Sequence, residues 1–199
     1  MDCMRPNVIW QSDGATQDLS PGRHFVDVCI CAFARESGLL NCLQSLVTQI
    51  NAPPFRVIIA DNHVEPVVPA WLSLAGAYPF PVVVVHAPQQ NIAVARNACL
   101  QTANAEWIAF IDDDEFAAPE WLATLVASAS THSSDVVFGR VQAIYPQDAP
   151  AWLVRGDFLS KAPARSGAGI TTGYTANVLI RRRCIASLRF DPAYGQTGG

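Results

Sequence analysis

Three aspartates and a glutamate, Asp112 to Glu115, directly follow an apolar run of strand length at 107–111. A strand buried on both faces reads as a continuous apolar run, and open α/β sheets bind ligands beyond the carboxyl ends of their strands. Packing gives no reason for three consecutive aspartates there, because they repel one another. Carboxylate oxygens are the ligands that hard divalent cations prefer. This stretch therefore predicts a cation-binding site at the mouth of a sheet.

Other polar groups follow or precede strands in the same way. Arg35 comes after the apolar run 25–33, Asp61 comes after the run 55–60, and Arg96 lies in a helix-like segment just ahead of the acidic residues. If the strands are parallel neighbours, these groups converge on one crevice. Asp61 can then accept from a base N–H or a ribose hydroxyl, and Arg96 offers a forked donor set to phosphate. A metal–nucleotide complex fits such a set.

Each of these residues also has a plainer interpretation. Asp61 can cap the turn that follows it, and Arg96 can pair with an acidic neighbour on its own helix. An Asp-Asp-Asp run can be a solvated loop or a helix cap. The residues alone leave these alternatives open.

The elements that must position these groups alternate in type along the chain. Short links between them predict parallel βαβ units. Residues 1–24 are expected to form a loose polar arm, and 145–169 a mobile loop rich in Pro, Gly and Ala. The predicted strands are 25–33, 55–60, 81–86, 107–111, 135–141 and 172–180. The predicted helices are 37–50, a short one within 66–80, 91–103, one from Pro119, and a short helix or turn at 181–185. Ser37 and Asn91 are the predicted caps of the helices that begin there.

Composition narrows the class of protein. The chain has 199 residues, of which half are apolar and 15% are charged, which predicts one globular domain with an ample core. The net charge of −4 gives no electrostatic footprint for nucleic acid. Six cysteines without metal spacing indicate core residues in a reducing compartment. The N-terminus does not read as a signal peptide, and no apolar run reaches bilayer length. We expect a cytoplasmic location, with peripheral membrane association left open.

Four segments together resemble the GT-A glycosyltransferases, and within them the inverting family 2. They are 28–35, 57–62, the pair 91–97 and 110–114, and 173–182. No one segment is decisive, but their order and spacing are specific over about residues 26–199. The resemblance implies a Rossmann-like α/β/α sandwich with a mainly parallel central sheet. It divides the domain 25–199 into a nucleotide-binding part, 25–118, and an incomplete acceptor-binding part, 119–199.

The resemblance also implies a function and a site. The enzyme would move a sugar from a UDP- or GDP-linked donor to a hydroxyl of a carbohydrate or lipid-linked acceptor, with inversion and with Mg²⁺ or Mn²⁺. Asp114, with Asp112, would hold the metal, and Asp113 would contact ribose. The residues implied in nucleotide-sugar binding are Ala32, Phe33, Arg35, Asp61, Arg96, Asp112 and Asp113.

The catalytic base is the part of the pattern that is missing. The resemblance places an acidic pair after a segment like 190–195 and the Gly-Gly that follows it, where this chain ends at Gly199. Asp191 is only a substitute candidate, because it aligns before the base. A non-catalytic nucleotide-binding fragment therefore stays an alternative. A sugar-phosphate nucleotidylyltransferase ranks lower, because residues 32–35 contain no glycine.

Overall fold

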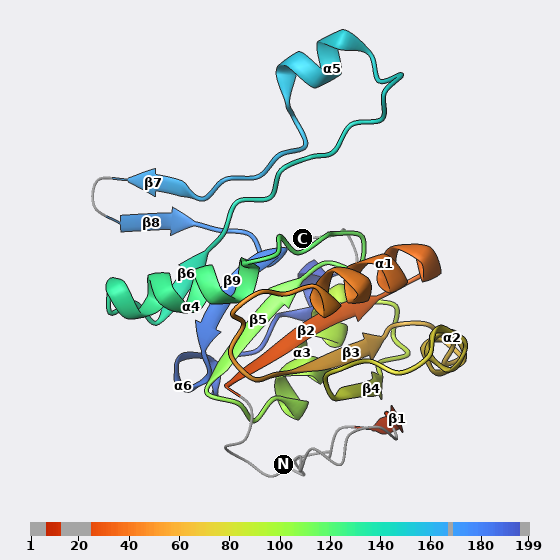
Figure 1. The fold of residues 1–199 in the computed structure, drawn as a ribbon. Coiled ribbons are helices and arrows are strands. Elements are labelled where there is room, and N and C mark those ends of the chain that lie inside the picture. The colour runs from red at the N-terminus through yellow and green to blue at the C-terminus, as the bar shows by residue number, and fades with distance from the viewer. Residues whose placement is uncertain (1–6, 13–24, 167–168, 196–199) are drawn as a thin grey trace.

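A seven-stranded sheet forms the centre of the computed structural model, which describes residues 7–12, 25–166 and 169–195 (Figure 1). The strand order is β1-β4-β3-β2-β5-β9-β6. The four inner strands β4, β3, β2 and β5 are parallel neighbours, and β1, β9 and β6 pair antiparallel at the two sides. The strands are β1 (Val8–Gln11), β2 (Val26–Ala32), β3 (Phe55–Asp61), β4 (Val82–His86), β5 (Trp107–Ile111), β6 (Val136–Phe138) and β9 (Asn177–Arg181).

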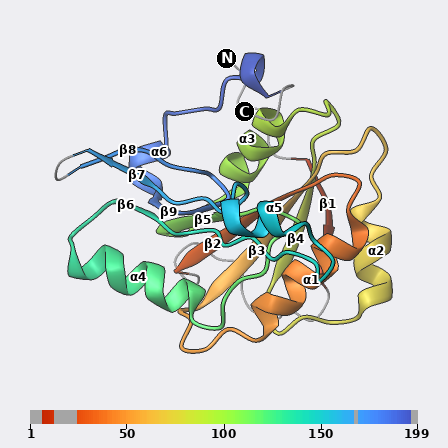
Figure 2. The same ribbon diagram turned by 90° about the horizontal axis from the view of Figure 1, so that it is seen from above.

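Helices cover both faces of this sheet (Figure 2). One face carries α1 (Glu36–Val47), α2 (Val68–Ala75) and α4 (Trp121–Thr131), whose buried side chains join those of β2 in a single core. The other face carries α3 (Ile92–Thr102), which packs on β2, β3 and β4. Shorter elements complete the chain: α5 (Ala151–Gly156), β7 (Ala164–Ser166), β8 (Gly169–Thr172), α6 (Arg182–Ile185) and the 3-10 turn η1 (Pro192–Tyr194). The result is the predicted α/β/α sandwich.

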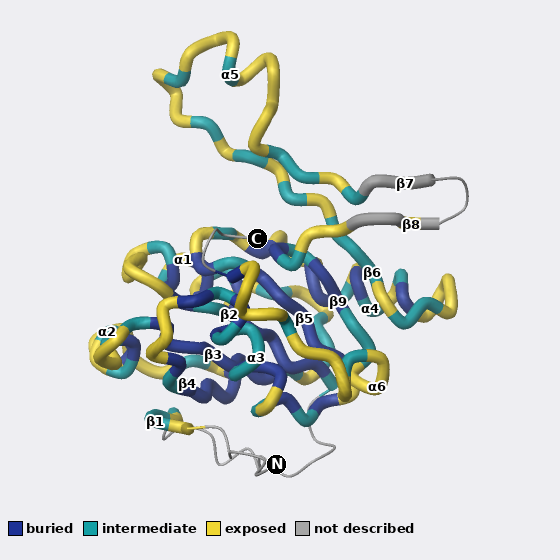
Figure 3. Tube along the Cα trace, turned by 180° about the vertical axis from the view of Figure 1, so that it is seen from behind, coloured by how far each residue is buried: buried dark blue, intermediate teal, exposed yellow. Residues whose placement is uncertain are grey.

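Strand alternation explains why the inner strands read as continuous apolar runs. Val28 and Ile30 of β2 belong to the core under α1, whereas Cys29 belongs to the core under α3. Successive side chains of a strand point to opposite faces, so nearly every position of a strand that is covered on both sides is apolar. Figure 3 shows these strands as the buried centre of the molecule.

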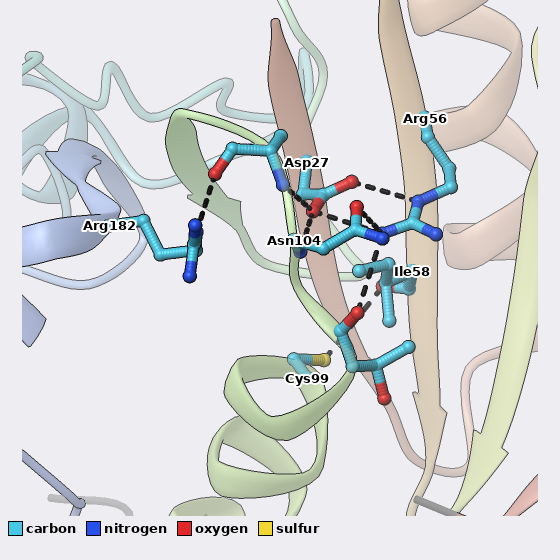
Figure 4. A network of polar contacts seen from close by, with 8 residues as sticks. Asp27, Arg56, Ile58, Cys99, Asn104 and Arg182 are labelled. Carbon is cyan, nitrogen blue, oxygen red and sulfur yellow. Dashed lines mark hydrogen bonds and ion pairs between the residues drawn. The ribbon is translucent and has the colours of Figure 1, made fainter. Parts of the chain in front are cut away.

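A buried ion pair fastens the amino ends of β2 and β3 (Figure 4). The Arg56 guanidinium donates to the Asp27 carboxylate from Nε at 2.8 Å and from Nη2 at 3.0 Å. Asp27 also accepts from the backbone N–H groups of Asn104 and Ala105, at 2.7 and 2.9 Å. The pair thus ties two strands to the connection between α3 and β5, at the end of the sheet where the chain enters these strands.

The sequence-based boundaries hold for the inner sheet and fail at its edges. Residues 8–11, expected in a loose arm, form β1, which pairs with β4. Residues 1–6 and 13–24 of the expected arm lie outside the described residues. Ser37 lies inside the first turn of α1 instead of capping it, and α1 ends at Val47. Pro119 precedes α4 by two residues. The expected strand 135–141 is only β6, and 172–180 divides between the end of β8 and β9.

The expected loop 145–169 also has structure of its own. It contains α5 and the first strand of the antiparallel hairpin β7–β8. The segment between Val141 and Lys161, which pair as an antiparallel bridge, stands away from the sheet in Figure 1. Its side chains include Ile144, Trp152 and Phe158, which are 81%, 67% and 71% exposed. The sequence of this segment is rich in Pro, Gly and Ala and lacks a clear helical or strand pattern, so it does not predict α5.

Candidate functional site

A cavity of about 390 Å³ opens where β2, β3 and β5 end. The parallel arrangement of these strands brings their carboxyl ends to one edge of the sheet, and the N-terminal turn of α3 closes another side. Both basic and acidic groups face the space. The lining residues are Cys31, Phe33, Arg35, Asn62, Gln90, Ile92, Arg96, Asp112, Asp113 and Gly195.

Asp113 joins the end of β5 to the turn after β2. Its side chain is 3% exposed, and it accepts from the Phe33 backbone N–H and from Arg35 Nη1, each at 3.0 Å. Burial raises the pKa of its carboxyl, and those two hydrogen bonds oppose the rise. Asp113 therefore fixes the position of Phe33 and Arg35 at the cavity wall.

Asp112 and Asp114, on either side, are directed differently. Asp112 lines the cavity; burial raises the pKa of its carboxyl, while the positive charge of Arg96 lowers it. The Asp114 side chain is half exposed and lies 3.6 Å from Arg35 Nε. Glu115 accepts weakly from the Asp112 backbone N–H, and burial followed by the charge of Asp112 raises its pKa to about 7. Negative charge is thus concentrated at the end of β5.

The donor set suits a divalent cation that also binds phosphate. Proteins usually hold Mg²⁺ on one or two carboxylates, and substrate phosphates and water fill the other positions. Asp112 and Asp114 provide two carboxylates at one turn, and the pKa of Asp112 is raised by its burial and, to a lesser extent, by the charge of Asp114. Among the residues that the structure describes, no group of three or more His, Cys, Asp or Glu side chains could hold an ion by itself. The residues present fit an ion that arrives with, or is completed by, a phosphate ligand.

Arg96 reaches the cavity from the first turns of α3. The helix begins after Asn91, whose side-chain oxygen accepts from the N–H groups of Ala93 and Val94 at 2.9 and 3.3 Å. The Arg96 guanidinium lies 5.4 Å from the centre of the Phe190 ring. A cation placed beside a helix N-terminus gives this side of the cavity a positive potential that favours anions.

The segment 190–195 is attached to α3 and brings Gly195 to the lining of the same cavity. The Asn97 side chain donates to the Phe190 carbonyl at 2.8 Å and accepts from the Phe190 N–H at 2.9 Å, and Asn91 donates to the Pro192 carbonyl at 2.9 Å. A Cβ on Gly195 would lie 1.8 Å from the Asn91 side-chain oxygen, so no larger residue fits without displacing the helix cap. Two asparagines of α3 thus attach a segment about one hundred residues away in sequence.

Comparison with known proteins identifies the family. Residues 27–189 match the model of Glycosyl transferase family 2. The chain belongs to this family. It is 39% identical over 180 residues to succinoglycan biosynthesis protein ExoM of Rhizobium meliloti, covering 87% of this chain and 58% of ExoM. It is 23% identical to the glycosyltransferase AglE of Haloferax volcanii, again over 58% of that protein. The chain thus spans little more than half the length of these relatives.

Solved structures share the fold. The structure of S. aureus TarS 1-349 in complex with UDP superposes with a TM-score of 0.62 at 18% identity, covering 85% of this chain and 51% of that one. Mannosyltransferase PcManGT from Pyrobaculum calidifontis, in complex with GDP-Man and Mn²⁺, gives a TM-score of 0.60 at 19% identity, covering 89% and 51%. Within the described part of this family 2 chain, no helix is long and apolar enough to cross a membrane.

The structure separates the residues predicted for this family 2 site into two groups. Phe33, Arg35, Arg96, Asp112 and Asp113 line the cavity together. Four others do not line it. Ala32 is buried in the core, and the Asp114 side chain is half exposed at the surface. The Asp191 carboxylate accepts from the Ala193 N–H and so caps η1. The fourth residue is Asp61. Their predicted roles stay predictions.

Asp61 shows the arrangement that the sequence had left as its alternative. Its carboxylate is fully buried and accepts from the N–H groups of Val67 and Val68 at the start of α2, at 2.8 and 2.9 Å. It also contacts His63 Nδ1 at 2.8 Å. In this structure it caps a turn, and the next residue, Asn62, lines the cavity.

Sequence reasoning missed Cys31, Gln90, Ile92 and Gly195 as lining residues, and it placed Asn62 at the crevice, as part of the polar pair after its strand, without giving it a role. A signal existed for Cys31, because residues two apart in a strand share a face and Cys31 shares that of Phe33. Asn62 follows the strand end directly. Gly195 had no local signal, since its place depends on the contact with Asn91.

Proposed function

We propose that this family 2 chain binds a nucleotide-diphosphate sugar, UDP- or GDP-linked, and serves its metal-assisted, inverting transfer to an acceptor hydroxyl. The observation that supports this most is the meeting of Arg96, Asp112 and Asp113 at one cavity beyond parallel strand ends. Fold neighbours in complex with UDP and with GDP-Man and Mn²⁺ support the same class of donor. Because the chain belongs to glycosyltransferase family 2, we do not retain the alternative of a sugar-phosphate nucleotidylyltransferase.

Each residue has a distinct task in this proposal. Asp112 and Asp114 would hold Mg²⁺ or Mn²⁺, which supplies positive charge next to the diphosphate as it departs. Arg96 donates to phosphate oxygens from the other side. Asp113 holds Phe33 and Arg35 in place, and its remaining lone pairs can accept from ribose. Asp61 does not line the cavity and therefore acts on the nucleotide indirectly. Inversion follows when the acceptor hydroxyl attacks the anomeric carbon from the face opposite the leaving diphosphate.

The acceptor hydroxyl must lose its proton during that attack, and a carboxylate is the usual base. Asp112 and Asp113 are the only carboxylates among the described residues that line the cavity, and both have other tasks. We therefore infer that the base comes from residues after the described segment 190–195. Because ExoM is a succinoglycan biosynthesis protein, we propose a carbohydrate or lipid-linked sugar as the acceptor.

A nucleotide titration tests the proposal. UDP and GDP are titrated into the chain by calorimetry with and without Mn²⁺, and the measurement is repeated with Arg96→Ala and Asp112→Asn. Loss of a hydrogen bond to a charged group costs about 1.5–3 kcal/mol, so Arg96→Ala should weaken binding roughly 10- to 150-fold. Asp112→Asn should remove most of the Mn²⁺ dependence. Asp148→Asn, an exposed acid on the projecting segment, is the control and should bind as the parent does.

Two results would contradict the proposal: no binding of either nucleotide, or equal Mn²⁺-dependent affinity in Asp112→Asn and the parent. A non-catalytic nucleotide-binding role is the second candidate, and the absence of an assignable base in the described part of the chain favours it. It predicts the same binding without release of nucleotide from UDP- or GDP-sugars. Turnover by a chain extended to the length of its relatives, against none by 1–199, would show that the missing groups are catalytic.

A further inference from the structure

The turn between β2 and α1 is held in an unfavourable backbone conformation. Ala34 has φ +56°, a left-handed value that residues with a Cβ avoid. Its neighbours Phe33 and Arg35 both line the cavity, so the turn decides where a bound nucleotide finds these two side chains. Something must stabilise this conformation against relaxation.

The contact that does so comes from His63. The Ala34 backbone N–H donates to His63 Nε2 at 2.8 Å. An imidazole nitrogen that accepts carries no proton, so the ring proton must lie on Nδ1. Nδ1 in turn lies 2.8 Å from Asp61 Oδ1, at the distance of a donated hydrogen bond. The two contacts specify one neutral tautomer and one ring orientation.

The surroundings of His63 keep the ring in that orientation. The buried Asp61 carboxylate is itself fixed by the N–H groups of Val67 and Val68. Trp71 meets the imidazole edge-on with ring centres 5.4 Å apart, and Phe33 lies across it at 5.1 Å with a tilt of 31°. His63 thus contacts the cavity-lining Phe33 on one side and the strained turn on the other, while it does not line the cavity.

We propose that His63 is a positioning residue for nucleotide binding. Its Nε2 holds the Ala34 amide and thereby keeps Phe33 and Arg35 at the cavity, and Asp61 acts on the nucleotide through His63 instead of touching the base. This deepens the proposed function and rests on it. A histidine of purely structural use would instead affect folding and leave the affinity of the folded protein unchanged.

Two amide variants separate the two hydrogen bonds of the ring. In His63→Gln the side-chain oxygen can take the place of Nε2 and accept from Ala34. In His63→Asn the amide can still donate to Asp61, but the side chain is too short to reach Ala34. Loss of one neutral hydrogen bond should raise the Kd for UDP or GDP in His63→Asn roughly three- to tenfold, whereas His63→Gln should stay within about twofold of the parent. Thermal unfolding of both variants shows whether either is simply less stable.

A measurement on the unmodified chain tests the contact without any ligand. The ¹⁵N shifts of the His63 ring should show protonated Nδ1 and bare Nε2, and the Ala34 amide should exchange slowly with deuterium. The opposite tautomer, or a fast-exchanging Ala34 amide, overturns the proposal. Equal affinities of His63→Asn and parent overturn it too. If the parent binds neither nucleotide, the proposed function has failed. If the parent binds a nucleotide and His63→Asn binds it with the same affinity, this inference alone has failed.

Discussion

Removing the guanidinium of Arg56 should destabilise the fold more than any surface change. Arg56 is 4% exposed and donates twice to the fully buried Asp27 carboxylate, at 2.8 and 3.0 Å, and once to the Asn104 side-chain oxygen at 3.0 Å. In Arg56→Met the carboxylate keeps only its bonds from the Asn104 and Ala105 N–H groups. Leaving one member of a buried ion pair behind costs about 3–5 kcal/mol. Because two backbone donors remain, we expect the lower end, about 3 kcal/mol.

Equilibrium urea unfolding followed by far-UV circular dichroism measures this loss as a lower midpoint at unchanged slope. For a domain of this size about 3 kcal/mol corresponds to a Tm lower by roughly 6–12 °C. Arg183→Met is the matched control, since Arg183 pairs with Asp135 at 2.8 Å but its side chain is 71% exposed; its midpoint should barely move. A loss in Arg56→Met below about 1 kcal/mol, or one equal to the control, would refute the argument from burial.

Two further outcomes follow from burial and from the attachment of the 190–195 segment. Cys29, Cys42 and Cys99 are buried, and burial raises the pKa of the Cys29 and Cys42 thiols. Cys31 lines the cavity, but a hydrogen bond with Cys99, followed by burial, raises the pKa of its thiol. Because Cys184 is exposed, a Cys3→Ser chain should present one fast-reacting thiol to a disulfide reagent before unfolding, and a second fast thiol in the native protein would contradict this reasoning. Asn97→Ala removes two hydrogen bonds to the Phe190 backbone and should make amide exchange at 190–195 roughly tenfold faster, with β5 unchanged as the internal control; unchanged exchange at Phe190 would count against this attachment.

The inner sheet could be predicted because its determinants are local. A strand covered on both faces is apolar except where a buried polar group finds a partner, as Arg56 does in Asp27, so the runs at 55–60 and 107–111 marked β3 and β5 within one residue at most. Asn91 marked the start of α3 because its short side chain can accept from the first free N–H groups of a helix. Polar residues just after such strands gather at one sheet edge, which is why Arg35, Asp112 and Asp113 could be predicted to meet there.

The edges of the fold depend on contacts that local patterns do not contain. β1 exists because Val8 to Gln11 pair with β4, more than seventy residues away. The wall formed by Gly195 likewise depends on Asn91, and no turn signal near residue 195 reports that. Asp61 is the sharpest case: an acid after a strand can point to a ligand or cap the next helix, and the choice was made by where the Val67 and Val68 amides fall.

The turn after β5 places three consecutive aspartates, which are the same residue type, in three different environments. Asp113 points back to the β2 turn and is neutralised there by Arg35; Asp112 faces the cavity; Asp114 faces solvent. Asp112 therefore places negative charge beside the space that a diphosphate would occupy. The cations Arg96 and Lys161, which both lower the pKa of Asp112, are too few to balance this acid, its acidic neighbours and the phosphates together. A bare nucleotide should be repelled there. A divalent cation between carboxylate and diphosphate removes that repulsion, which is why we expect nucleotide affinity and metal affinity in this chain to rise and fall together.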